Sequence, residues 1–219
     1  MPVPAPTEWA LNILQPQDDH GKRRAALLAA AFKVMAEVGF EGLRTRAVAD
    51  LAGVNISTLH YYFPTKQNLV EGLATFISAK FITLHGPAPA PSGLPALDGL
   101  RQEFSDVGYY LAHHPDLILA MQEFTIRGKR DAEVLKIVNQ MGGHWQSGIE
   151  RMLQSGLADG TFRSEFALPE VLTFLMAVLS GTVNLTPDRI AAVQKQTEQY
   201  LLSDKAQRQL SKKSGAKKK

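Results

Sequence analysis

The chain contains no cysteine among its 219 residues. Disulfide bonds, thiolate nucleophiles and thiolate metal sites are therefore excluded. The sequence also lacks an uninterrupted run of about 18 apolar residues, which argues against a transmembrane helix. No positively charged start is followed by an apolar core, so we expect no secretory signal. Together, these absences predict a cytoplasmic protein.

The motifs of several common enzyme classes are missing as well. There is no glycine-rich phosphate loop, no Gly-x-Ser-x-Gly turn and no zinc-protease motif. The nearest approach to a metal set is made by His113, His114, His144 and Asp116, but the spacings His-x-x-x-His and Glu-x-x-x-His are absent around them. We therefore interpret these histidines as surface or helix-end residues and not as metal ligands. We expect no catalytic residue, no metal and no cofactor.

Positive charge is concentrated at the C-terminus. The net charge is +3, and five lysines lie in the last eight residues, so the net charge without them is −2. The pI of about 9.1 is therefore largely a property of this tail. Because the final residues have no apolar face, we predict a basic disordered tail over residues 204–219. Three interpretations of such a tail stay open: a solvated extension, a remnant of the expression vector, or a source of non-specific attraction to phosphates.

The N-terminal residues 1–18 contain four prolines around a small apolar cluster. Prolines at this density predict a flexible, mostly irregular arm, whose apolar cluster near Trp9 could dock on the body. The arm has no basic residue before Lys22, so we do not assign it to nucleic-acid contact.

The remainder of the sequence has helical periodicity and no alternating run typical of a strand. A first helix is predicted from Asp18 or Asp19 to Gly39, with Leu28, Ala31, Phe32, Met35 and Val38 buried. The proline-rich stretch Gly86–Pro95 predicts an extended linker loop. The sequence thus predicts an all-α fold of about nine helices. After the first helix and the motif below, the predicted helices are 65–84, 97–113, 115–127, 131–158, 169–183 and 187–202.

Two short helices joined by a tight turn are predicted between Leu43 and Lys66. Thr45 is a suitable N-cap for the first, and Gly53 can adopt the left-handed conformation that ends it. Asn55 or Ser57 can cap the second helix. The residues predicted to face inward are Val48, Leu51, Ala52, Leu59 and Phe63. Those predicted to face outward are Ser57, Thr58, His60, Tyr61 and Tyr62. This pattern is a helix-turn-helix with a polar and aromatic recognition helix.

The order of these motifs resembles the TetR family of bacterial one-component repressors over about residues 22–80, without gaps. Two positions depart from the family pattern: His60 replaces a frequent tyrosine, and Ser57 replaces a frequent glycine or proline. An imidazole at position 60 could make DNA binding mildly dependent on pH. The positions that carry the resemblance are Leu27-Leu28, Ala31, Gly39-Phe40, Thr45, Ala49, Gly53-Val54, Ser57-Thr58-Leu59 and Tyr61-Tyr62-Phe63-Pro64-Thr65-Lys66.

The resemblance implies a three-helix HTH DNA-binding domain with its connecting helix over 19–84, and a helical effector-binding and dimerisation domain over 85–203. It further implies a homodimeric repressor that leaves double-stranded operator DNA when a small apolar or aromatic effector binds. Other classes remain open: an activator, a DNA-organising member, a helical small-molecule-binding protein, or an enzyme built on the helical body.

The expected DNA contacts follow from the same resemblance. Thr45 and Lys66 are expected to contact phosphates, and Arg46 to reach a guanine edge or a phosphate. The basic residues Lys22, Arg23 and Arg24 are either a phosphate clamp or a solvated turn. The complete predicted set is Arg44, Thr45, Arg46, Asn55, Ser57, Thr58, His60, Tyr61, Tyr62 and Lys66.

In the second domain, the segment Leu168–Leu185 is apolar on nearly every side and must be buried on every side. We expect a homodimer through the last two helices to provide the second surface, with a purely intrachain core as the alternative. Aromatic and isolated polar residues of the central helices fit an apolar effector cavity, although each could be ordinary core. The candidate ligand-binding residues are Phe104, Tyr110, Gln122, Trp145 and Phe174.

Overall fold

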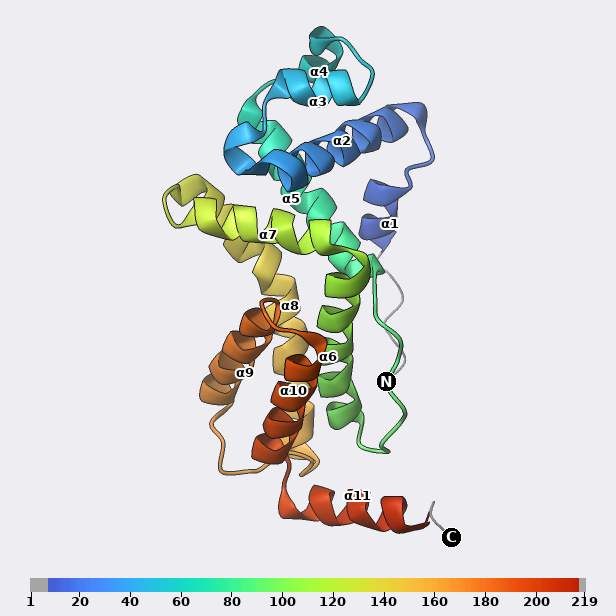
Figure 1. Cartoon of the computed structure of the whole chain (residues 1–219), viewed down its shortest axis with the longest axis vertical. Helices are drawn as coiled ribbons and strands as arrows, with labels where there is room; N and C mark the ends of the chain where they lie inside the picture. The colour runs from blue at the N-terminus through green and yellow to red at the C-terminus, as the bar shows by residue number, and fades with distance from the viewer. Residues whose placement is uncertain (1–7, 217–219) are drawn as a thin grey trace. The chain divides into compact units, whose positions relative to one another are not determined.

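A computed structural model describes residues 8–216 of the chain, and side chains as far as Lys212. Within this range the chain is all-α, as predicted, with eleven helices instead of about nine and no strand beyond one isolated bridge, Phe162 to Leu202 (Figure 1). No helix in the described range is long and apolar enough to cross a membrane. The helices are α1 Glu8–Leu14, α2 Asp19–Gly42, α3 Thr45–Leu51, α4 Ile56–Tyr62, α5 Lys66–Thr83, α6 Pro95–His113, α7 Pro115–Gly128, α8 Ala132–Ala158, α9 Leu168–Thr182, α10 Pro187–Leu201 and α11 Asp204–Ala216.

The described chain divides into two compact units. The HTH unit contains residues 8–85 and 113–143, and the C-terminal unit contains residues 86–112 and 144–216. The first boundary between the units, between His85 and Gly86, lies next to residue 84, where the sequence predicted the end of the DNA-binding domain. However, α7 and the first part of α8 belong to the HTH unit, whereas the sequence assigned them to the effector domain.

Helix α2 is defined by a cap at one end and a kink at the other. The Asp18 carboxylate accepts a hydrogen bond of 2.7 Å from the backbone N–H of Gly21, as expected of an N-cap. Gly39 has a φ of 73°, so the helix bends there and Phe40 turns into the core. Val38, predicted to be buried, is 60% exposed because it immediately precedes this bend. The rest of the predicted stripe is buried: Leu28, Ala31, Phe32 and Met35.

The prediction of an irregular N-terminal arm is wrong for Glu8–Leu14, which form α1. Helix α1 packs against α5 and α2, and Ala10 is fully buried in that contact. A seven-residue helix is unstable alone, so its packing surface, which local composition does not reveal, is what orders it. The rest of the predicted arm, residues 1–7, lies outside the described residues.

The C-terminal unit has its own core between α6, the second part of α8, α9 and α10. Gly156 allows the buried Phe162 ring to approach the backbone of α8 closely, since a Cβ at this position would lie 2.2 Å from Cδ2 of that ring. Other members of this core are Leu97, Leu100, Phe104, Ile149, Leu153, Leu175, Leu179 and Leu201.

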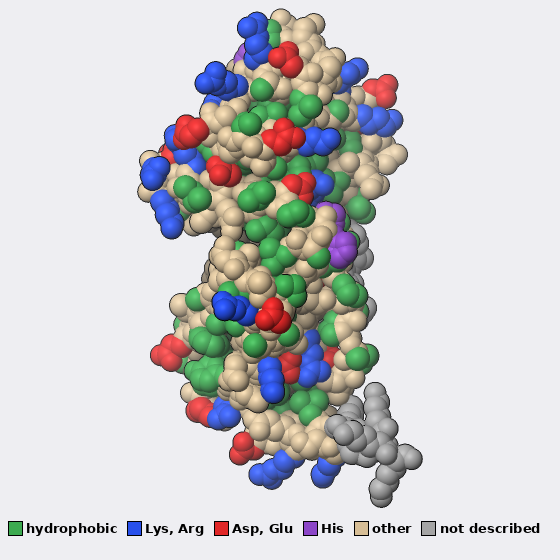
Figure 2. Space-filling model, viewed as in Figure 1, with side chains coloured by type: hydrophobic (Ala, Val, Ile, Leu, Met, Phe, Trp, Pro, Cys, Tyr) green, Lys and Arg blue, Asp and Glu red, His purple; other side chains and the backbone are tan. Residues whose placement is uncertain are grey.

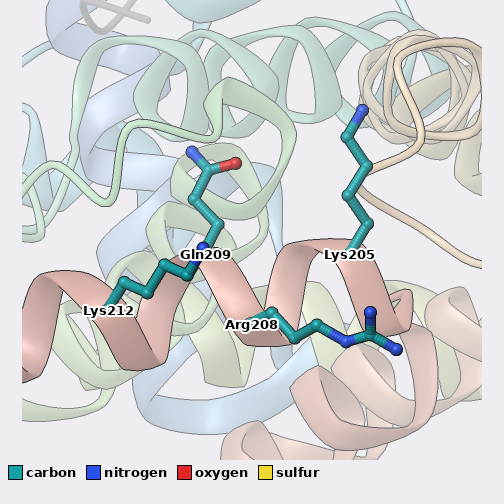
Figure 3. A pocket seen from close by; sticks show the side chains of 4 residues that line it. All are labelled: Lys205, Arg208, Gln209 and Lys212. Atoms are coloured by element: carbon teal, nitrogen blue, oxygen red, sulfur yellow. The ribbon is translucent and has the colours of Figure 1, made fainter.

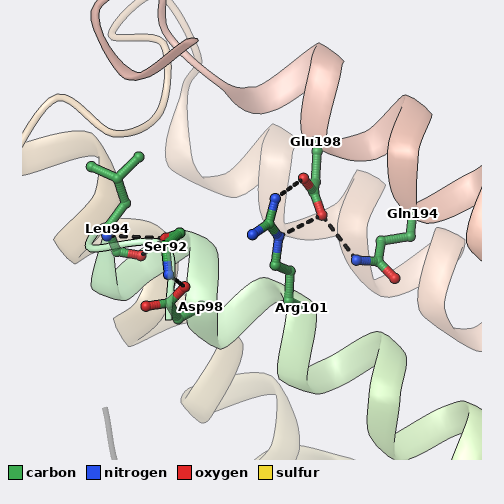
Figure 4. A network of polar contacts seen from close by, with 6 residues as sticks. All are labelled: Ser92, Leu94, Asp98, Arg101, Gln194 and Glu198. Carbon is green, nitrogen blue, oxygen red and sulfur yellow. Dashed lines mark hydrogen bonds and ion pairs between the residues drawn. The ribbon is translucent and has the colours of Figure 1, made fainter. Parts of the chain in front are cut away.

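Polar contacts tie α6 to α10 and to the preceding linker (Figure 4). The Arg101 guanidinium donates two hydrogen bonds, of 2.9 and 2.7 Å, to the Glu198 carboxylate, which raises the pKa of Arg101. Gln194 donates to the same carboxylate at 2.9 Å. In the linker, which has no helix as predicted, the backbone N–H of Ser92 donates to Asp98 at 2.8 Å. The linker is therefore held at its C-terminal end by the first turn of α6.

The predicted disorder of residues 204–219 is also wrong for Asp204–Ala216, which form α11. Ala206 is buried, and Leu210 packs against the core of the C-terminal unit. This pair, four residues apart, provides the apolar side that the last nine residues alone lack. Residues 217–219 lie outside the described residues.

Candidate nucleic-acid interface

A tight turn joins α3 and α4. Gly53 has a φ of 66°, and its backbone N–H donates to the carbonyl of Asp50 at 3.1 Å, while that of Val54 donates to Ala49 at 3.0 Å. A Cβ at Gly53 would meet no atom within 4 Å, so glycine is favoured here by backbone conformation and not by space. This confirms the predicted end of the first helix of the motif.

Helix α4 is capped by Asn55, one of the two predicted caps. Its side-chain oxygen accepts hydrogen bonds from the Thr58 backbone N–H at 2.7 Å and from the Thr58 hydroxyl at 2.9 Å. Leu59 and Phe63 are buried, as predicted. Asn55 and Thr58 therefore fix the start and the orientation of α4, and the Asn55 side-chain oxygen and the Thr58 hydroxyl are already bonded to each other.

The exposed side of α4 carries Ser57, His60 and Tyr61, and Tyr61 is 72% exposed. The Tyr61 and Tyr62 rings form a T-shaped pair with centroids 5.1 Å apart. The ring of His20, near the start of α2, lies 4.7 Å from Tyr62 and 6.1 Å from Tyr61. The sequence interpretation missed His20, because nothing in its local pattern indicates contact with a residue forty positions away.

Two arginines lie at the start of α3. Arg44 is its N-cap without a side-chain capping bond, and Thr45 is the first helical residue, so the prediction of Thr45 as cap is wrong. The side chains of Arg44 and Arg46 are exposed and have no ion pair among the described residues. Leu51, predicted to face inward, is 50% exposed, and Ala49 is buried instead. Unpaired cations at a surface attract polyanions, and these two stand at the start of α3, the helix that packs against α4.

The remaining predicted basic residues differ in their surroundings. Lys66, the first residue of α5, is exposed after the Thr65 cap, with its ammonium 5.9 Å from the Phe40 ring centre. Arg24 lies over the Phe63 ring at 5.1 Å, so it packs against the domain. Lys22 pairs with Asp19 at 3.6 Å, and Arg23 is exposed. The proposed clamp therefore reduces to Lys22 and Arg23.

Helix α7 holds the end of α2 in place. The Glu123 carboxylate accepts a hydrogen bond of 2.7 Å from the Phe40 backbone N–H, directly after the kink. Arg127 pairs with Glu41 at 2.6 Å and with Asp131 at 2.9 Å. The hydrogen bond from Arg127 lowers the pKa of Asp131. These contacts connect α7 to the segment that leads into α3, and the sequence interpretation did not find them.

The five predicted ligand-binding residues lie in different environments. Phe104 and Trp145 share the core of the C-terminal unit, where the indole N–H of Trp145 donates to Glu103 at 2.7 Å. Tyr110 is buried, and burial, reinforced by Asp106 and Glu103, raises the pKa of its phenol.

Of the remaining two candidates, Gln122 belongs to α7 in the HTH unit, and Phe174 is 37% exposed on α9. No group of three or more metal-ligating side chains occurs in the described range.

The exposed side of α9 is partly apolar, with green side chains visible over α9 in Figure 2. Phe174 lies 4.9 Å from the Tyr200 ring of α10, and Phe166 lies 4.8 Å from the same ring, between centroids. Tyr200 is itself 48% exposed. The two last helices of the predicted domain thus share an aromatic cluster that reaches the surface.

Comparison with known proteins supports the DNA-binding interpretation. The profile of the bacterial regulatory proteins of the tetR family matches residues 27–73. The chain is 25% identical over 150 residues to the HTH-type transcriptional repressor NicS of Pseudomonas putida, covering 67% of this chain and 69% of that protein. It is 43% identical over 47 residues to the HTH-type transcriptional regulator RutR of Escherichia coli, 22% of each chain.

The fold also has solved counterparts. A TetR transcription regulator from Haloarcula marismortui matches with a TM-score of 0.67 at 16% identity, over 83% of this chain and 99% of that one. At this identity, the likeness concerns the fold alone.

Proposed function

This chain belongs to the TetR family of bacterial regulatory proteins, and we propose on that basis that it is a homodimeric repressor released from its operator by a small apolar or aromatic molecule. The observation that carries the proposal is the exposed side of α4, together with the exposed and unpaired Arg44 and Arg46 at the start of α3 in the same motif. A helix-turn-helix places such a face in the major groove of duplex DNA.

The roles of the predicted contacts follow from their surroundings. Ser57, His60 and Tyr61 are the base-reading candidates, because they are exposed on α4. Arg44, Arg46 and Lys66 are free to reach phosphates or base edges. Asn55 and Thr58 bond to each other, so we assign them to positioning α4 rather than to reading bases. Thr45 remains a phosphate-contact candidate, and Tyr62, stacked beside His20, supports Tyr61.

Dimerisation is proposed through α9 and α10. A two-fold dimer presents two recognition helices to two half-sites of one operator. The exposed aromatic pair Phe174 and Tyr200 is suited to burial against a second copy. This use of Phe174 replaces its proposed role in ligand binding.

Effector binding is proposed to act on the equilibrium between the free and the operator-bound dimer. Of the candidates for the ligand cavity, Phe104, Tyr110 and Trp145 provide apolar walls. The Tyr110 phenol is protonated at neutral pH, and burial raises its pKa further. Gln122 neighbours Glu123, whose carboxylate holds the Phe40 backbone. A ligand that favours the conformation with lower DNA affinity weakens operator binding by linkage.

The test is a fluorescence-anisotropy titration of the protein against the DNA that flanks its own coding region, at two salt concentrations. A scrambled duplex of equal length is the control. We expect tighter binding to the native sequence at both salt concentrations. Equal affinity for both duplexes would contradict sequence-specific regulation.

A further inference from the structure

Helix α11 is firmly attached to the C-terminal unit. Its first turn is capped by Ser203, whose hydroxyl accepts from the Ala206 N–H at 3.2 Å and donates to the carbonyl of Gly160 at 2.6 Å. The Gln207 side chain donates to the carbonyl of Leu202 at 3.1 Å. With Ala206 buried and Leu210 against the core, one side of α11 is fixed. The opposite side is therefore presented at a defined place.

The side of α11 away from Ala206 and Leu210 is basic, with Lys205 at its edge next to Gly160. Lys205, Arg208 and Lys212 fall within about 60° of one another around the helix axis, at about 100° per residue. All three are exposed, and none has an ion pair among the described residues. Blue side chains gather over α11 in Figure 2. We call Lys205, Arg208 and Lys212 the α11 basic face.

The α11 basic face is open and extended. Lys205, Arg208, Gln209 and Lys212 line a shallow pocket, but the charged ends of Lys205 and Arg208 point in different directions (Figure 3). Divergent cations do not enclose a single small anion. Lys205 and Lys212 are separated by about 10 Å along the helix, so the face is shaped for a row of negative charges.

A lipid surface fits this face poorly. Interfacial helices insert apolar side chains into the bilayer, beside their basic residues. Here the apolar side of α11 is packed against the core, and no large exposed hydrophobic residue lies between Asp204 and Lys212. Duplex DNA instead offers closely spaced phosphates and requires no apolar insertion.

We propose that the α11 basic face is a second, sequence-independent contact for duplex DNA, distinct from the recognition helix α4. The choice of DNA among polyanions rests on the proposed function. Each cation that neutralises a phosphate releases counterions, so the contact adds affinity that decreases steeply with salt. It would hold non-operator DNA while α4 carries sequence preference.

The experiment uses three variants of the full chain. The α11 variant is Lys205→Gln/Arg208→Gln/Lys212→Gln. A matched charge control is Lys129→Gln/Arg130→Gln/Arg151→Gln, three exposed cations outside α4, α9 and α10 that remove the same net charge. The head variant is Arg44→Gln/Arg46→Gln/Lys66→Gln. Circular dichroism confirms that each is folded. Binding to a scrambled duplex is measured by anisotropy at 50 and 200 mM KCl.

We expect the α11 variant to bind the scrambled duplex more weakly than wild type at 50 mM KCl. The factor by which affinity falls between 50 and 200 mM KCl should be about 40 times smaller for this variant than for wild type, as expected for the loss of about three phosphate contacts. The charge control should retain most of the wild-type salt dependence. If the α11 variant and the charge control behave alike, only net charge matters and the proposed contact is wrong.

The head variant separates this inference from the proposed function. It should lose preference for the native flanking DNA, while retaining the salt-dependent binding that the α11 substitutions remove. If preference never exists in wild type but the α11 effect does, the repressor proposal fails and the second contact stands.

A vesicle-binding assay tests the alternative that the α11 basic face binds a lipid surface. Vesicles of phosphatidylcholine with one-third phosphatidylglycerol should bind wild type and the charge control equally weakly. Binding to vesicles that the α11 substitutions abolish, without any change in DNA affinity, would overturn the DNA assignment.

Discussion

At the scale of single residues, Arg46 is the strongest test of the α4 surface. Its side chain is exposed in the first turn of α3 and has no ion pair in the described range. We expect Arg46→Ala to weaken operator binding by about 1–3 kcal/mol while the melting temperature is unchanged. Arg151→Ala, which removes another exposed arginine, is the control. An operator titration indistinguishable from wild type would remove Arg46 from the interface.

Asn55 provides a second residue-scale prediction, because its role is structural. Asn55→Ala removes the acceptor for the Thr58 N–H and hydroxyl and should lower the free energy of unfolding by about 0.5–2 kcal/mol. Asn55→Asp keeps an acceptor at the N-cap and should retain most of the stability. Thermal unfolding followed by circular dichroism measures both. Equal losses in the two variants would show that the cap contributes little.

Helix α7 and its contacts are tested at the scale of elements by pH. The hydrogen bond from Arg127 holds the pKa of Asp131 below its ordinary value. A depressed folded-state pKa contributes stability that is present above the unfolded pKa and lost as pH falls through the folded pKa. Asp131→Asn should therefore lower the melting temperature at pH 7, and the difference from wild type should shrink as pH falls from about 4 through the depressed folded-state pKa.

A matched control for this prediction is Glu133→Gln, which breaks an exposed pair with Lys136 one turn away. Exposed pairs of this kind contribute little, so its melting temperature should stay near that of wild type. A difference between Asp131→Asn and wild type that does not shrink between pH 7 and the lowest pH at which both proteins remain folded would contradict the assignment of Arg127 as the cause.

The element boundaries show what sequence could predict. Helices α6 to α10 begin and end within about two residues of the prediction, because prolines and glycines mark their ends. Helices α1 and α11 were missed for a common reason. Helix α1 lies in a proline-rich stretch and α11 contains few apolar residues, and the surfaces that order Ala10 and Ala206 are distant in the chain. Local composition cannot report a tertiary contact.

The candidate sites differ in the same way. The exposed side of α4 could be predicted, because helical periodicity separates Leu59 and Phe63 from their exposed neighbours. The contacts of His20 and Glu123 could not, since each bridges segments far apart in sequence. The ligand candidates were chosen by residue type alone. That choice grouped the buried Phe104 with the exposed Phe174, although the two have different environments.

At the scale of the whole molecule, the proposed function depends on a second copy of the chain. The exposed Phe174 and Tyr200 rings, 4.9 Å apart, are the apolar surface that a partner would cover. Phe174→Glu places a charge where burial in a dimer would require its desolvation. We expect this variant to be a folded monomer by light scattering after size exclusion, whereas wild type is a dimer.

A monomer presents one recognition helix, so Phe174→Glu should also bind the operator far more weakly than wild type, with its α4 surface intact. Ile126→Glu, which changes another hydrophobic residue of 53% exposure on α7, controls for the added charge and should remain dimeric. A wild-type protein that is monomeric at the concentrations used for DNA binding would refute the α9–α10 interface directly. A Phe174→Glu dimer would instead move the interface away from this aromatic pair while leaving the contacts of α4 unaffected.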